Sequence, residues 1–312
     1  MKQSPDSVII TLLYYCRNGG NGDVIMPKTI IASDSSCDLS KELIERYNVH
    51  IQPYSVIMGD DQFRDGVDVS PDDIYAYHDR TGKLARTAAL NVAENTEFFE
   101  GLKEDPADEI VFFTISSQMS GTNQYARTAA EDVGGVYVID SKNLSTGVGL
   151  SVIKAAELAE QGMPASEIAD YINNKMVDYI NTSFIIDSLE YLHKGGRCSA
   201  LSALGANLLK LKPCIEVKKG VMGVGKKYRG RFEDVLKEYT AARLADADNI
   251  DLERVFVTHA GCKPEVVETI AQQVKNTLPF KEVLVTRAGA TVSVHCGANT
   301  LGVLFVQKTK VE

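Results

Sequence analysis

Residues 110–122 read IVFFTISSQMSGT, an apolar run followed by a turn that is rich in hydroxyl groups. The apolar residues 110–115 predict a buried strand, and residues 123–132 predict a helix. The turn between them contains Ser116, Ser117, Ser120 and Thr122, together with Gly121. A strand that passes directly into a helix at a polar turn is typical of the α/β class.

This turn has two interpretations. Ser and Thr before a helix are most often N-caps. A strand–helix junction can also bind an anion, because its free backbone N–H groups and the helix dipole favour negative charge. The turn contains no Lys or Arg, so we expect neutral donors and a small anionic group such as a carboxylate.

The region around the turn, residues 27–162, alternates short apolar strands with helices. Such alternation predicts a mainly parallel sheet with right-handed crossovers. Polar residues follow three of the strands, at Asp34-Ser35, Ser116-Ser117 and Asp140-Ser141. The carboxyl ends of parallel strands meet at one edge of a sheet, so we expect these residues to converge on a site.

The pattern changes after Met163-Pro164, where strands and hairpins suggest a smaller mixed sheet faced by helices. The predicted fold class is therefore α/β in two domains. Residues 27–162 form a three-layer α/β/α domain with a mainly parallel sheet. Residues 163–312 form an α/β domain with a mixed sheet of about six strands. We also expect a loop at 86–91 and a helix at 199–210.

Residues 1–26 require separate treatment. The apolar run at 8–15 is too short to span a bilayer, and the flanking residues do not resemble a signal peptide. A Gly- and Asn-rich segment follows, and a convincing strand begins only after Met26. The hypothesis is that residues 1–26 form a flexible leader, of which residues 1–25 are dispensable and outside the native protein, with Met26 as the initiator.

Composition excludes several classes of function. The net charge of −9 argues against nucleic acid as a partner. The six cysteines are scattered without a zinc spacing or a disulfide framework, so we expect free thiols, a cytoplasmic location and no metal. The sequence carries no nucleotide-binding fingerprint, and no cofactor is expected.

Further polar groups lie outside the turn. His295 stands in a Gly-bounded segment, and Thr87 is an ordinary N-cap candidate. Arg197 ends a basic Lys-Gly-Gly-Arg turn without P-loop spacing. An alternative function is a serine-dependent hydrolase or an acyl or phosphoryl transferase with Ser116 or Ser117 as the nucleophile, although no activating base is evident. A sensor of another small anion is a third alternative.

Several motifs, taken in order along the chain, resemble the DegV family of fatty-acid-binding proteins, the acyl-carrying subunits of bacterial fatty acid kinase. The resemblance covers about residues 28–307. It rests on the opening strand and turn at 31–39, the SSQMSGT turn, Asp140-Ser141 at a strand end, and the segment 189–197 followed by Lys212-Pro213.

The resemblance implies a long-chain fatty acid, such as a C16–C18 acid, in a buried apolar channel. Thr87, His295 and either Ser117 or Ser116 would hold its carboxylate. The supporting turns would comprise Asp34, Ser35, Ser120, Gly121 and Thr122, and Arg197 would meet a phosphate or the kinase.

The resemblance further implies that an ATP-dependent kinase subunit phosphorylates the bound acid. The chain would then be a lipid-binding protein without chemistry of its own, and transient membrane contact is compatible with that role. The segments 87–90 and 295–299 depart from the family pattern, which leaves the preferred acyl chain open.

Overall fold

The computed structural model describes residues 27–198 and 211–311; the predicted leader and the predicted helix at 199–210 lie outside these residues. The first sheet has the order β2-β1-β6-β7, and every neighbouring pair is parallel, as predicted. Its strands are β1 (Thr29–Asp34), β2 (His50–Gln52), β6 (Glu109–Thr114) and β7 (Val136–Asp140).

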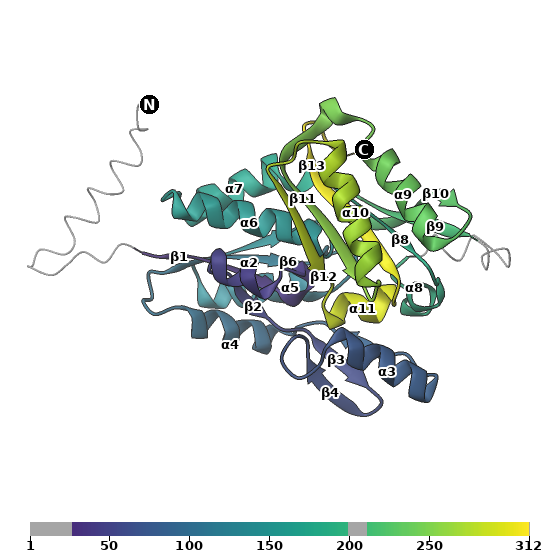
Figure 1. The fold of residues 1–312 in the computed structure, drawn as a ribbon. Helices are drawn as coiled ribbons and strands as arrows, with labels where there is room; N and C mark the ends of the chain where they lie inside the picture. Colours follow the sequence, from purple (N-terminus) through teal and green to yellow (C-terminus); the bar gives the residue numbers. More distant parts are fainter. Residues whose placement is uncertain (1–26, 199–210, 312) are drawn as a thin grey trace, which may run out of the picture.

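Helices cover both faces of this parallel sheet. One face carries α4 (Val92–Leu102) and α5 (Thr122–Val133), and the other carries α2 (Lys41–Arg46), α6 (Thr146–Glu160) and α7 (Ala165–Lys175) (Figure 1). Strand residues alternate between the faces, so that Phe112 packs towards α4 and α5 while Phe113 packs towards α6. The helix α7 lies beyond the predicted boundary at residue 163 but packs on β6 and β7.

The second sheet is mixed and six-stranded, in the order β10-β9-β8-β13-β11-β12, so it is larger than the four-stranded parallel sheet and not smaller as expected. Within the described residues its one parallel pair is that of β11 with β12. The strands are β8 (Ile180–Ile186), β9 (Lys212–Lys218), β10 (Val221–Tyr228), β11 (Ile250–Ala260), β12 (Glu282–Arg287) and β13 (Thr300–Gln307). The helices α9 (Phe232–Arg243) and α10 (Pro264–Thr277) cover one face, and α6 lies against the other. These sheets confirm the predicted fold class.

A third, smaller sheet corrects one expectation. It has the order β4-β3-β5, with β3 (Ser55–Met58), β4 (Asp61–Arg64) and β5 (Arg86–Ala88). The segment predicted as a loop at 86–91 therefore begins with a strand. Three residues carry too little pattern to predict β5, which forms because Thr87 and its neighbours pair with β3.

The remaining helical segments pack around these sheets. The helix α3 (Pro71–Thr81) starts with a capping box in which Ser70 and Asp73 bond each other's backbone, as the Ser-Pro-Asp-Asp sequence predicts. The others are α8 (Glu190–Gly195), α11 (Ala290–Cys296), η1 (Ser35–Cys37), η2 (Val177–Tyr179) and η4 (Ala247–Asn249).

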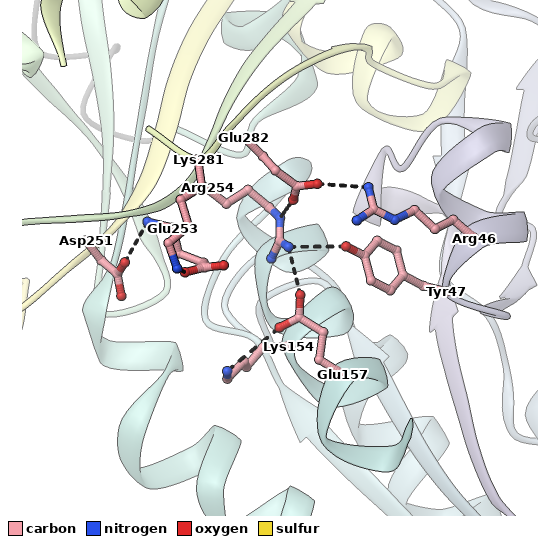
Figure 2. A network of polar contacts seen from close by, with 9 residues as sticks. All are labelled: Arg46, Tyr47, Lys154, Glu157, Asp251, Glu253, Arg254, Lys281 and Glu282. Atoms are coloured by element: carbon pink, nitrogen blue, oxygen red, sulfur yellow. Dashed lines mark hydrogen bonds and ion pairs between the residues drawn. The ribbon is translucent and has the colours of Figure 1, made fainter. Parts of the chain in front are cut away.

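A charged network joins strands β11 and β12 of the mixed sheet to helices α2 and α6, which cover the parallel sheet (Figure 2). Arg254 on β11 bonds Glu157 on α6 and Glu282 on β12, each at 2.7 Å. Arg46 on α2 bonds the other oxygen of Glu282 at 2.8 Å. The Arg254 side chain is 8% exposed, so its two ion pairs are partly shielded from solvent screening, whereas Arg46 is exposed.

Candidate functional site

A cavity of about 230 Å³ lies between the mixed sheet and the polar edge of the parallel sheet. Even-numbered residues of β8, β11 and β13 form one wall, including Phe184, Ala260 and Leu304. Residues such as Ile115, Met119 and Leu144 form the opposite wall. An apolar cavity of about 150 Å³ can bind benzene, so this one is large enough for an apolar ligand group.

The polar ends of the parallel strands converge as predicted. Ile115 donates its backbone N–H to Asp34 Oδ2 at 2.8 Å, and Ser117 Oγ donates to Asp140 Oδ2 at 2.6 Å. β1, β6 and β7 are adjacent, which brings their carboxyl ends to one edge. The cavity lies at that edge, the usual position of a ligand in an α/β fold.

Thr87 and His295 lie together on the cavity wall. Thr87 Oγ1 is 2.9 Å from His295 Nε2, although 208 positions separate them in the chain. Pairing of β5 with β3 places Thr87, and α11 brings His295 opposite it. No local pattern in the sequence could have predicted this contact.

The imidazole of His295 is neutral at ordinary pH. Burial, with a smaller contribution from the charge of Arg197, lowers its pKa to about 4. Nδ1 is buried without a hydrogen-bond partner, and a Cβ atom on Gly195 would lie 2.7 Å from it. When the proton is on Nε2, His295 donates to Thr87, and the Thr87 hydroxyl proton is available to a ligand.

Ser120 is the hydroxyl of the SSQMSGT turn that lines the cavity. Thr122 Oγ1 accepts from Tyr54 Oη at 2.7 Å and from Leu90 N at 3.2 Å. Ser120 Oγ lies 3.1 Å from Thr122 Oγ1, where either hydroxyl can donate, and it also accepts from Tyr54 Oη and from the Thr122 N–H, both at 3.3 Å. When Thr122 is the donor to Ser120, the Ser120 proton is available to a ligand.

Ser116 and Ser117, which the resemblance places at the ligand carboxylate, are not among the residues that line this cavity. Ser116 Oγ is buried and donates to the Gly220 carbonyl at 2.7 Å. Ser117 is exposed and bonds Asp140 through both its hydroxyl and its backbone N–H. The turn directs these two side chains away from the cavity, and their partners include no imidazole to activate a nucleophile.

Asp34 and Ser35 support the site without lining the cavity. The buried Asp34 carboxylate accepts from Ser36 as well as Ile115, and burial raises its pKa to about 6. Ser35 Oγ donates to Asp65 at 2.9 Å and accepts from the Tyr54 backbone N–H. These bonds fix the edge that carries Tyr54 and the Ser120 turn.

Tyr54, Asp38 and Asp65 are site-building residues that the sequence did not single out. Asp65 accepts from the backbone N–H groups of Ala290 and Thr291, and Asp38 accepts from that of Gly289. The two carboxylates therefore hold the start of α11, the helix that carries His295. An acidic residue at a turn gives no sequence signal for a helix more than 200 positions away.

Arg197 is exposed and lies at the rim of the cavity. Its guanidinium donates to the Gly195 carbonyl at 2.7 Å. Arg197 therefore places a positive charge where a ligand enters or leaves the cavity. In the described parts of the chain no cluster of His, Cys, Asp or Glu could hold a metal ion, and no helix there could cross a bilayer.

The fold and the cavity define a class: an α/β protein with a largely apolar cavity whose wall includes hydroxyl groups and a neutral imidazole. A family model described as an uncharacterised protein of the DegV family matches residues 28–308. The chain belongs to the DegV family.

Relatives and solved structures resemble nearly the whole chain. A DegV domain-containing protein of Clostridium perfringens is 31% identical, covering 91% of this chain and all of the relative. A Thermus thermophilus DegV family protein, described by its fatty acid binding, superposes with a TM-score of 0.82 at 28% identity, over 90% of this chain and 99% of that one. A stearic acid-binding protein of Eubacterium ventriosum superposes with a TM-score of 0.77 at 28% identity, over 91% of this chain and 99% of that one.

Proposed function

We propose that the protein binds a long-chain fatty acid in this cavity and presents its carboxylate to a partner kinase. The carboxylate is held by Ser120, Thr87 and His295, and the acyl chain lies against the apolar walls. The observation that carries the proposal is the Thr87–His295 pair on the wall of a largely apolar cavity that Ser120 also lines. The fatty acid binding described for the similar Thermus protein and the stearic acid named for the Eubacterium protein support it.

The acyl chain and the carboxylate of the fatty acid contribute to binding in different ways. A buried methylene contributes about 0.8 kcal/mol, so a sixteen-carbon chain contributes roughly 10 kcal/mol before ordering costs. A buried carboxylate is unfavourable unless it is hydrogen-bonded, and charge-assisted bonds from hydroxyl donors offset much of that cost. Affinity therefore comes from the chain, and orientation comes from the donors.

The partner we propose is an ATP-dependent kinase subunit that converts the carboxylate into an acyl phosphate. The protein performs no chemistry alone in this scheme. Arg197 supports the scheme because it is an exposed cation at the rim, where a transferred phosphoryl group would need one.

Extraction of the purified protein tests the binding step. Mass spectrometry after denaturation is expected to release a fatty acid in a near-equimolar amount. A protein that carries no acid and also takes up none from added palmitic or stearic acid would contradict the proposal.

Incubation of the loaded protein with the kinase and ATP tests whether the carboxylate is presented to the kinase. We expect Arg197→Ala to slow acyl phosphate formation without releasing the acid.

A further inference from the structure

The wall that the mixed sheet contributes to the cavity has two ends along the strand β13. Three even-numbered residues of this strand, Thr300, Gly302 and Leu304, line the cavity. Thr300 lies beside α11, because its hydroxyl donates to the carbonyl of Cys296, the residue after His295. Leu304 lies four residues further along the strand, or about 13 Å away. The wall therefore runs from the His295 end of the cavity to Leu304.

The strands on either side of β13 have the same limit. On β11, Thr258 pairs with Gly302 and lines the cavity, whereas Phe256, the partner of Leu304, does not line it. On β8, Thr182 lies at the level of Leu304 and is the first residue of its strand to line the cavity. In the described part of β13, no residue beyond Leu304 lines it. The sheet wall therefore ends at the level of Leu304.

The side chain of Leu304 lies between the cavity and the core. A Cβ atom on Gly302 would lie 3.0 Å from Leu304 Cδ1, so the leucine side chain extends back over the glycine. Leu304 is 3% exposed and belongs to the apolar cluster of Ile153 and Phe256. Among the described residues, it is the one member of that cluster that lines the cavity. Its isobutyl group therefore separates the cavity from the core.

This position of Leu304 limits the length of an acyl chain. A chain whose carboxylate lies at Thr87 and His295 extends along the wall towards Leu304. Each further methylene that leaves water adds to the affinity. A chain that is longer than the wall must displace Leu304 or the close-packed residues behind it, which is unfavourable. Affinity should therefore rise with chain length up to one value and fall beyond it.

We propose that Leu304 determines the chain length of the ligand, because its side chain closes the end of the cavity opposite the Thr87–His295 pair. The inference rests on the proposed fatty-acid binding and adds a specificity-determining residue to it. A smaller side chain at position 304 extends the cavity and favours a longer acid.

Competition among saturated acids tests this role. Delipidated protein is offered equal amounts of the even-numbered acids from tetradecanoic to docosanoic acid, and the bound acids are quantified by mass spectrometry. We expect the unsubstituted protein to prefer one length. Leu304→Ala removes three carbon atoms from the end wall, which makes room for about two methylenes, each contributing a factor of about four in affinity. The bound ratio of the acid two carbons longer to the originally preferred acid should therefore rise about tenfold.

Leu304→Val is the second variant, and it decides the matter if the alanine variant does not fold. It removes one carbon atom, so the same ratio should rise by a smaller factor. Leu150→Ala is the matched control. Leu150 on α6 is 2% exposed and belongs to the same apolar cluster, but it does not line the cavity, so its truncation should leave the ratio unchanged.

Three outcomes overturn the inference. The first is affinity that rises with length throughout the series in the unsubstituted protein. The second is an unchanged or shortened preference in the Leu304 variants. The third is an equal change in Leu150→Ala, which would show that a looser core alone alters the preference. A protein that binds none of the acids would instead contradict the proposed function.

Discussion

Ser117 and Ser120 lie three positions apart in one turn, but only Ser120 lines the cavity. We predict that Ser120→Ala weakens fatty acid binding by about tenfold or more, because it removes a hydrogen bond to a charged group that contributes about 1.5–3 kcal/mol. Ser117→Ala is the control and should leave the dissociation constant unchanged. Calorimetric titration of delipidated protein with palmitic acid measures both, and an equal loss in the two variants would contradict the assignment of Ser120.

Asp38 makes stability depend on pH. Burial is the main cause that raises the pKa of its carboxyl to about 8, while an unfolded Asp titrates near 4. Above about pH 4 the folded state therefore keeps a proton that the unfolded state has released. The stabilisation that this proton gives is lost progressively as pH rises through about 8. We predict that Asp38 alone lowers the free energy of unfolding by about 1.5 kcal/mol between pH 6.5 and pH 8, and that the protein as a whole loses about 1 kcal/mol.

In this window the shifted histidines act in the opposite direction to Asp38. Asp34, with a pKa of about 6, completes most of its titration below pH 6.5. His295 is already neutral when folded, but in the unfolded state it loses its proton around pH 6.5, which raises the free energy of unfolding by about 0.4 kcal/mol. Burial also lowers the pKa of His259, which acts in the same direction as His295. Asp38→Asn mimics the protonated carboxyl and suits the left-handed backbone at this position, where φ is 50°. Urea unfolding of this variant should give a free energy of unfolding that is no lower at pH 8 than at pH 6.5; a fall like that of the unsubstituted protein would exclude Asp38 as its source.

The sequence identified part of the residue-level arrangement. Family resemblance singled out Thr87 and His295, and the alternation of strands predicted that Asp34 and the SSQMSGT turn would converge. Which hydroxyl of the turn lines the cavity was not predictable, because it depends on how the turn bends after Ile115. Tyr54 gave no signal either, since its role depends on a bond to Thr122 across 68 positions.

At the scale of elements, long periodic segments were predicted well and short paired ones were not. The strand at 110–115 and the helix after it appear as β6 and α5 within one or two residues. In contrast, β5 has three residues and takes its conformation from its pairing with β3. Since Thr87 is the middle residue of β5, the missed strand is the one that positions part of the candidate site.

The Arg254 network offers a test of how elements are held together. We predict that Arg254→Ala lowers the free energy of unfolding by about 3 kcal/mol or more, because Glu157 would remain partly buried without this cation. The control is Lys281→Ala, since the Lys281–Glu253 pair drawn in the same network is exposed at both ends (Figure 2). Its effect should be below about 1 kcal/mol. Denaturant unfolding of both variants measures the difference, and similar losses would contradict the role given to Arg254.

At the scale of the molecule, α6 lies between the two large sheets. A single apolar cluster contains Ile31 and Phe113 from the parallel sheet, Ile153 from α6, and Phe256 and Leu304 from the mixed sheet. The cavity is likewise shared, with Ser120 on one side and His295 on the other. Core and ligand site thus depend on both sheets at once, although the sequence pattern describes two successive regions.

The last prediction follows from this shared core. Unfolding of the two sheets should be one cooperative event, and a fatty acid that contacts both should stabilise them equally. At a free ligand concentration of 100 times the dissociation constant, the expected gain is about 2.7 kcal/mol. Hydrogen exchange measured by mass spectrometry tests this, because the slowest amides of β6 and β13 exchange through global unfolding. Both sets should slow by the same factor, about 100, when palmitic acid is added. Protection confined to β13 would mean that the sheets unfold separately and that the ligand stabilises only the mixed sheet.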